Sequence, residues 1–217
     1  MNSEKARFNM IEQQIRPWNV TNPRVLETLA LVRRERFVPK AWRTLAFADF
    51  AIPIGQGQRM WPPRIEARIL QALALKGSEN VLEIGSGTGY TAALLAAHAE
   101  WVRSLEIEPL LARLANENLE RNGVFNVIVS VQDGSQGWQA HAPYDVILAG
   151  GAVRTIPQAW LDQLKEGGRL FAFIGEAPLV RATLITRLAD GSLQQKSLFE
   201  TRTDSLCIAG DRKEFAL

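Results

Sequence analysis

Three glycines at alternate positions are the feature of this sequence best suited to chemistry. Gly85, Gly87 and Gly89 follow an apolar stretch, residues 80–84, and precede a segment of helical character that begins at Tyr90. Glycine permits positive φ and lets a ligand approach the backbone closely. The helix that follows offers unpaired N–H groups and a partial positive charge. The pattern therefore predicts a strand–turn–helix loop that binds a cofactor.

The spacing of this loop separates three classes of cofactor. A P-loop ends in Gly-Lys-Ser/Thr, which this loop lacks, and a dinucleotide loop has glycine where this chain has Tyr90. The remaining pattern, with Glu83 two residues before the first glycine, resembles motif I of the class I methyltransferases, which bind S-adenosylmethionine. That cofactor carries an ammonium group and no phosphates, so we expect Glu83 to suit the ammonium, directly or through water. The expected loop contacts to its amino-acid end are Gly85, Ser86, Gly87 and Gly89.

Two further acidic residues follow the next two expected strands. Glu106 ends the first of them, beside Ile107, and a carboxylate there can accept hydrogen bonds from both ribose hydroxyls. The alternative is a solvated acid at a strand end. Asp133 follows the second, where it could accept from an adenine amino group while Gly134 lets the ring lie close. The alternative is a plain turn, since Asp-Gly is a common turn pair.

Strand and helix patterns alternate from residue 79 onward. Repeated βα units imply a mostly parallel sheet covered on both faces, and residues 181–199 are expected to add an antiparallel hairpin around Asp190-Gly191. Such a sheet binds ligands beyond the carboxyl ends of its strands. The expected strands are 80–84, 101–106, 126–131, 144–148, 169–174 and a last one near 205–209, and the helices are 90–98, 109–121 and 157–164.

The first third of the chain lacks this alternation of strand and helix patterns. Residues 1–50 look helical, with Asn22 as an N-cap before Pro23. Residues 51–63 hold glycines and prolines and are expected to form a shaped loop. The expected organisation is one α/β domain over residues 1–217, with a helical extension and substrate loop over 1–78 and a Rossmann-like core over 79–217.

The chain resembles the protein-L-isoaspartate O-methyltransferases over most of its length. The Pro-Ile-Gly-Gln-Gly-Gln text of residues 53–58 is specific to that family, and generic methyltransferases lack it. The resemblance implies a seven-stranded class I methyltransferase fold with S-adenosylmethionine as cofactor. It also implies methyl transfer to the free α-carboxyl of isoaspartyl residues, which arise when Asn and Asp backbones rearrange. Further matching stretches are residues 25–39, 81–90, 133–134, 137–138, 142–145, 156–157 and 164–168.

Three stretches depart from the family's usual text. Trp61 stands where the family has the serine usually treated as its active-site residue, and Pro62 stands for a glutamine. Residues 150–154 replace an Ala-Ala-Pro-like stretch, and residues 200–206 replace Val-Arg-Phe-Val-Pro-Leu. Trp cannot supply a small hydroxyl, so the catalytic residue is left unknown. Trp61 is expected to be a lid or stacking surface, a plug at the substrate entrance, or core packing. The resemblance places Ile54, Gln58, Trp61 and Ala152 on the substrate side.

Composition and charge limit the classes of partner and the compartment that we expect for this protein. A net charge of +2 argues against nucleic-acid and membrane-surface partners. The N-terminus lacks a signal-peptide pattern and the single Cys207 excludes an internal disulfide, so we expect a cytoplasmic protein. Cys207 is expected to be a buried strand residue and His98 a helix cap, and no metal is expected. The tryptophans expected in the core, apart from Trp61, are Trp18, Trp42, Trp101, Trp138 and Trp160.

Three functions remain open besides the leading one, a protein carboxyl methyltransferase. The acceptor could instead be a small molecule, or the chain could bind the cofactor without turnover. A nicotinamide oxidoreductase is disfavoured by Tyr90. Because a carboxylate acceptor is already deprotonated at neutral pH, it needs no general base, which agrees with the lack of an obvious catalytic histidine.

Overall fold

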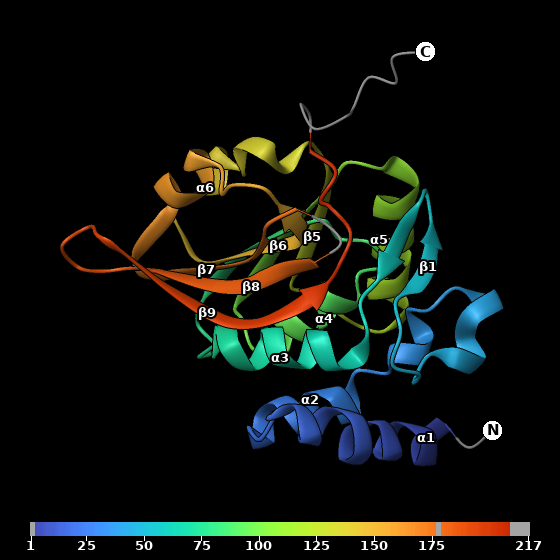
Figure 1. Ribbon diagram of the computed structural model, residues 1–217. Coiled ribbons are helices and arrows are strands. Elements are labelled where there is room, and N and C mark those ends of the chain that lie inside the picture. The colour runs from blue at the N-terminus through green and yellow to red at the C-terminus, as the bar shows by residue number, and fades with distance from the viewer. Residues whose placement is uncertain (1–2, 177–178, 209–217) are drawn as a thin grey trace.

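A seven-stranded sheet forms the centre of the molecule. The structure, a computed structural model, describes residues 3–176 and 179–208. The strands of the central sheet are β3 (Asn80–Ile84), β4 (Trp101–Glu106), β5 (Val127–Val131), β6 (Tyr144–Val153), β7 (Leu164–Ile174), β8 (Leu179–Arg187) and β9 (Leu193–Arg202). Two further strands, β1 (Ile52–Gly55) and β2 (Gln58–Met60), form a separate two-stranded sheet. The sheet order is β5-β4-β3-β6-β7-β8-β9 (Figure 1). The first five of these strands run parallel, β8 pairs antiparallel with β7, and β9 pairs antiparallel with β8. This confirms the predicted fold class.

The parallel strands are buried on both faces because their side chains alternate between two apolar layers. Val81 and Val146 belong to the larger core cluster, which also takes in the N-terminal helices. Leu82 and Ile147, one residue further along, belong to the cluster on the other face. The apolar runs that indicated buried strands in the sequence therefore supply both layers.

Helices cover the two faces of the sheet. In Figure 1, α3 and α4 lie below the sheet and α6 lies above it. The N-terminal helices pack beneath α3, outside the sheet layers. The α-helices are α1 (Ser3–Met10), α2 (Pro23–Leu31), α3 (Pro63–Leu73), α4 (Tyr90–Ala96), α5 (Pro109–Arg121) and α6 (Gln158–Asp162). The structure also has a π-helix, η1 (Ile11–Ile15), and the 3-10 helices η2 (Arg16–Trp18), η3 (Arg34–Arg36), η4 (Lys40–Leu45), η5 (Gly134–Gln136) and η6 (Gln139–His141).

The start of α2 follows the sequence signal closely. The Asn22 side chain accepts hydrogen bonds from the backbone N–H groups of Arg24 and Val25, and Pro23 occupies the first helical position. An N-cap acceptor satisfies donors that have no partner inside the helix, and proline there loses no hydrogen bond. The buried face of α2, with Val25 and Leu29 among its members, packs into the larger core cluster.

The expected loop at residues 51–63 is instead an antiparallel hairpin followed by a helix. Ile52 pairs with Met60 and Pro53 with Arg59 across β1 and β2. The turn between the strands places Gln56 and Gly57 at φ of 54° and 72°, a left-handed conformation that glycine adopts readily. Glycines and prolines here shape a hairpin turn, which the sequence pattern did not separate from an irregular loop.

Several smaller expectations are wrong. Cys207 is exposed, and the expected last strand reduces, within the described residues, to a single bridge between Ala152 and Ser205. Trp18 and Trp101 are 36% and 39% exposed, so neither is a core residue.

The expected capping role of His98 is wrong, because its side chain bonds to a residue of another helix. Its Nε2 lies 2.7 Å from Thr28 Oγ1, which joins the end of α4 to α2. Burial lowers the pKa of His98.

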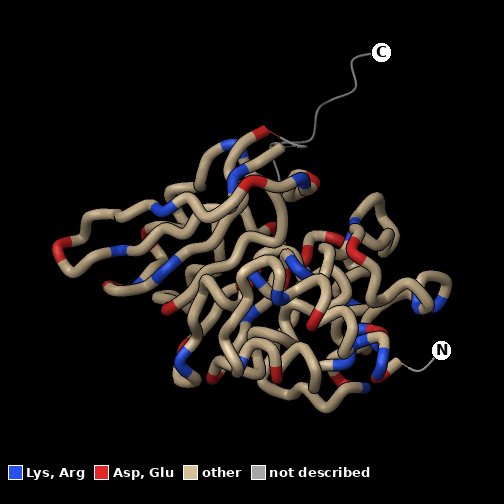
Figure 2. The backbone as a smooth tube through the Cα atoms, turned by 60° about the horizontal axis from the view of Figure 1, so that its bottom comes forward, with Lys and Arg blue, Asp and Glu red and all other residues tan. Residues whose placement is uncertain are grey.

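Basic and acidic residues are interspersed along the described chain, as Figure 2 shows. This distribution fits the small net charge of +2. No helix among the described residues combines the length and apolar character needed to span a membrane.

Candidate functional site

A cavity of about 650 Å³ lies at the point where the strand order reverses. β3 has β4 on one side and β6 on the other, so the connections that leave β3 and β6 diverge. Ligands of open α/β sheets bind at such a point, beyond the carboxyl ends of the strands. The cavity is walled by the loops after β3, β4 and β5, by Gly150 and Gly151 in β6, by the β1–β2 hairpin, and by residues 200–207 at and beyond the end of β9.

The glycine loop forms one wall of this cavity. Gly85, Ser86 and Gly87 all line it, and Gly85 and Gly87 have φ of 99° and 52°. Gly85 N–H donates to the carbonyl oxygen of Leu105 at 2.7 Å, which ties the loop to β4. A backbone at positive φ with no Cβ exposes its N–H groups to a ligand.

Glu106 lies opposite the loop, at the end of β4. Its carboxylate accepts hydrogen bonds from the backbone N–H of Gly87 at 2.8 Å and of Glu108 at 3.1 Å. Burial raises the pKa of Glu106, and these N–H donors oppose that shift. A carboxylate has about four acceptor positions, so acceptor capacity remains for hydroxyl groups. Glu106 and Ile107 both line the cavity.

Glu83 does not line the cavity. It is buried behind the loop, where Ser104 Oγ donates a hydrogen bond to its carboxylate, and burial raises its pKa to about 8. Ser104 Oγ lies 2.6 Å from Ser86 Oγ, and Ser86 does line the cavity. The described geometry therefore offers no direct contact from Glu83 to a ligand and connects it to the cavity through two hydroxyl groups.

Asp133 and Gly134 differ in their position relative to the cavity. Gly134 lines the cavity, whereas Asp133 does not. The Asp133 carboxylate accepts from the N–H and Oγ of Ser135 at 3.0 and 2.8 Å, which caps η5. A Cβ on Gly134 would lie 2.3 Å from Ile84 Cγ2, so the close approach of Ile84 already requires glycine there.

Gly89 also has a packing role. It does not line the cavity. Its φ is 80°, and a Cβ there would lie 3.1 Å from the carbonyl oxygen of Ala115 in α5. The third glycine of the loop thus permits the packing of α4 against α5.

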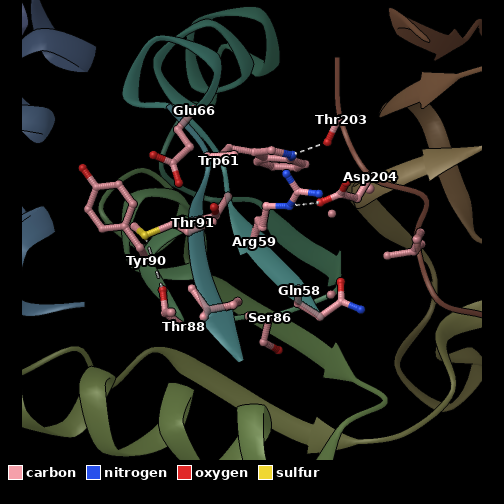
Figure 3. Close-up of a pocket in the computed structure, with 18 of the residues that line it drawn as sticks. Gln58, Arg59, Trp61, Glu66, Ser86, Thr88, Tyr90, Thr91, Thr203 and Asp204 are labelled. Atoms are coloured by element: carbon pink, nitrogen blue, oxygen red, sulfur yellow. Dashed lines mark hydrogen bonds and ion pairs between the residues drawn. The ribbon is translucent and has the colours of Figure 1, made fainter. Parts of the chain in front are cut away.

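Of the four substrate-side residues, Ile54, Gln58 and Trp61 line the cavity and Ala152 does not. Trp61 is only 9% exposed, and its ring meets the edge of Phe173 at 5.3 Å between centroids. Its indole Nε1–H donates to Thr203 Oγ1 at 2.8 Å (Figure 3). Trp61 is therefore both part of the core and part of the cavity wall.

Two other contacts join the same two segments of the cavity wall. Arg59 forms an ion pair with Asp204 at 3.1 Å (Figure 3). Gln58 Nε2 donates a hydrogen bond to Cys207 Sγ at 3.2 Å. Together with the Trp61–Thr203 hydrogen bond, these contacts form part of the cavity wall. They bring residues 58–61 and 203–207 together although more than 140 positions separate them in the sequence.

Ala152 positions one of these segments from behind. Its N–H donates to the carbonyl oxygen of Asp204 at 2.9 Å, and its own carbonyl accepts from Leu206 N–H at 2.8 Å. A Cβ on Gly151 would lie 2.8 Å from the backbone nitrogen of Leu206, so glycine is needed for this close approach. Residues 200–206 thus contact both of the other stretches that depart from the family's usual sequence.

A buried ion pair at the cavity was missed from the sequence. Glu66 lines the cavity, is 2% exposed, and accepts a hydrogen bond from Arg34. Burial raises the pKa of Glu66, and the Arg34 guanidinium opposes that shift. Tyr90 also lines the cavity, and its buried hydroxyl has no hydrogen-bond partner within the described chain. The helical spacing of α3 indicates a buried face but not which residue across the fold meets it.

Comparison with known proteins places this site in a family. The family model described as protein-L-isoaspartate(D-aspartate) O-methyltransferase matches residues 5–206. A protein-L-isoaspartate O-methyltransferase 1 of Syntrophobacter fumaroxidans is 45% identical over 81% of this chain and 82% of its own. A protein-L-isoaspartate O-methyltransferase 2 of Marinobacter nauticus is 43% identical over 90% of each chain.

A solved structure gives the same result for the fold. A structure described as a protein-L-isoaspartate O-methyltransferase superposes with a TM-score of 0.78 at 27% identity, over 94% of this chain and 65% of that chain. This chain thus spans just under two thirds of that longer protein. The chain belongs to the protein-L-isoaspartate(D-aspartate) O-methyltransferase family, whose members are S-adenosylmethionine-dependent protein carboxyl methyltransferases.

Proposed function

We propose that this protein transfers the methyl group of S-adenosylmethionine to the free α-carboxyl of isoaspartyl residues in damaged peptides and proteins. The observation that carries the proposal is the placement of Glu106 and the glycine loop on one side of the cavity and Trp61 and Thr203 on the other. A cofactor and an acceptor can then share one cavity. Family membership supports the choice of both.

The residues of the cofactor side fit a sulfonium nucleoside with an amino-acid end. The exposed backbone of Gly85 and Gly87 suits its carboxylate, and Glu106 has acceptor positions left for ribose hydroxyls. Gly134 lines the cavity and places its backbone where the adenine could lie. Glu83 is expected to act on the ammonium only through Ser104 and Ser86, or through water.

The chemistry asks little of the protein beyond alignment. The bound cofactor supplies a methyl group on a positively charged sulfur, which is already a strong electrophile. One oxygen of the acceptor carboxylate forms the new C–O bond as the C–S bond breaks, and no proton is transferred. The protein must hold the two groups in line and exclude water. The buried side chain of Trp61 in the cavity wall serves that exclusion.

A labelled methyl-transfer assay tests this function. The purified protein is incubated with methyl-labelled S-adenosylmethionine and a synthetic peptide that contains one isoaspartyl residue. The matched control is the same peptide with a normal aspartyl residue. We expect base-labile label in the isoaspartyl peptide and background label in the control. Equal background in both, from protein that still binds S-adenosylhomocysteine, would contradict the proposal and favour a different acceptor.

A further inference from the structure

The hydrogen bond between Trp61 and Thr203 leaves one hydroxyl proton unassigned. An indole N–H can only donate, so Thr203 Oγ1 is the acceptor at 2.8 Å. A threonine hydroxyl can donate as well as accept. Among residues 3–176 and 179–208, the Thr203 hydroxyl donates no hydrogen bond. Because Thr203 lines the cavity, that proton is available to a ligand.

The indole that holds this hydroxyl is itself fixed. The Trp61 ring packs edge-on against Phe173, and its backbone carbonyl accepts a hydrogen bond from Arg34 at 2.5 Å. Arg34 is fully buried and is paired with Glu66. The orientation of the Trp61 N–H is therefore set by packing, and the Thr203 oxygen must lie where that N–H points.

The backbone after Thr203 is fixed as well. Asp204 and Leu206 form hydrogen bonds with Ala152 in β6, at 2.9 and 2.8 Å. The Asp204 side chain forms an ion pair with Arg59 at 3.1 Å. Thr203 thus has a defined position between the end of β9 and this anchored segment, with its side chain directed at Trp61 as Figure 3 shows.

We propose that the Thr203 hydroxyl, oriented by Trp61, donates a hydrogen bond to one oxygen of the acceptor carboxylate and so positions its other oxygen for attack on the methyl group. This inference rests on the proposed function and deepens it. The hydroxyl that the sequence lacks at position 61 is supplied by a residue that lies beside Trp61 in the cavity wall, 142 positions further along the chain. The step needs no base, because the hydroxyl keeps its proton throughout.

Isosteric variants of Thr203 test the proposal. Thr203→Val removes the hydroxyl and keeps the shape, whereas Thr203→Ser keeps the hydroxyl. A hydrogen bond to a charged group predicts a fall of roughly tenfold or more in kcat/KM for the isoaspartyl peptide in Thr203→Val. The fall should appear mainly in KM for the peptide, since the bond is present before and during transfer. Thr203→Ser should stay within about threefold of the unchanged protein.

Two further variants separate positioning from stability. Trp61→Phe keeps a ring at the site but removes the N–H, and it should also raise KM for the peptide. Thr186→Val, in β8 and outside the cavity lining, is the matched control and should leave the kinetics unchanged. Affinity for S-adenosylhomocysteine, measured by calorimetry, should be the same in all four variants, which shows that the cofactor side is intact.

The outcomes distinguish failure of the proposed role of Thr203 from failure of the proposed function. Thr203→Val with kinetics like the unchanged protein, or Thr203→Ser as impaired as Thr203→Val, overturns the role of the hydroxyl and leaves the proposed function standing. Absence of turnover on the isoaspartyl peptide by the unchanged protein, with cofactor binding intact, overturns the proposed function and this inference together.

Discussion

Arg34 in η3 donates a hydrogen bond to the backbone carbonyl oxygen of Trp61 at 2.5 Å. The same guanidinium lies 5.0 Å from the ring centroid of Tyr90, the first residue of α4 after the glycine loop. One side chain of the N-terminal extension thus contacts both the substrate-side wall and the helix that follows the cofactor loop. The extension therefore serves to fix the relative position of these two walls, and the Arg34–Glu66 pair is the part of it that can be tested most simply.

Glu66→Gln is expected to lower the free energy of unfolding by about 3–5 kcal/mol, because it leaves the Arg34 charge buried without a counter-charge. Chemical denaturation monitored by tryptophan fluorescence measures this change. The matched control is Glu117→Gln, which removes the acid of an exposed pair with Arg121 in α5 and should cost at most about 0.5 kcal/mol. Equal effects of the two substitutions would show that the buried pair does not stabilise the extension.

Gly134→Ala is expected to lower the free energy of unfolding by about 1–3 kcal/mol, because the new Cβ would overlap Ile84 Cγ2. Thermal unfolding measures the cost. In an Ile84→Ala background, which lacks that Cγ2 atom, the same change at Gly134 should cost clearly less. The same cost in both backgrounds would mean that contact with Ile84 is not the reason for glycine at this position.

Glu83 makes stability depend on pH. Burial first, and then the nearby acids Glu106 and Glu66, raise its pKa from the unfolded value of 4.5 to about 8, while the Ser104 hydroxyl opposes them. The folded state therefore binds more protons than the unfolded state between these values. The stabilising contribution of the protonated Glu83 is full below about pH 4.5 and is lost as pH rises through about 8.

Glu83→Gln, which cannot ionise, should flatten this dependence. The free energy of unfolding at pH 5, 6.5 and 8 is compared for the two proteins by urea denaturation. The difference between Glu83→Gln and the unchanged protein should shift in favour of the variant by at least about 1 kcal/mol from pH 5 to pH 8. A difference that stays constant over that range would contradict the raised pKa.

Much of the fold could be predicted because its core is made of local patterns. Strands β3 and β4 and helix α5 match the expected ranges at both ends. Each begins or ends at a strong local signal, such as Pro109 at the start of α5. The seven-stranded sheet follows from repetition of such βα units.

The candidate site was less predictable because its substrate side is made by distant contacts. No local sequence pattern predicts that Thr203 lies against Trp61, or that Ala152 forms hydrogen bonds with the Asp204 segment from outside the cavity. The sequence left open whether Glu83 would reach a ligand directly or indirectly, for a similar reason. Its strand position is right, but Ser104 of the neighbouring strand lies between it and the loop. Alternation along a strand predicts which face a residue takes, not which neighbour it meets there.

The central claim is that the cavity beside the glycine loop binds S-adenosylmethionine through Glu106. Isothermal titration with S-adenosylhomocysteine, on the unchanged protein and on Glu106→Ala, tests it most directly. Exposed Glu120 in α5 provides the control substitution, Glu120→Ala. We expect one site in the unchanged protein and in Glu120→Ala, and affinity weaker by roughly 100-fold in Glu106→Ala, because two charge-assisted hydrogen bonds are lost. No binding heat from the unchanged protein, or equal affinity in Glu106→Ala, would contradict the account.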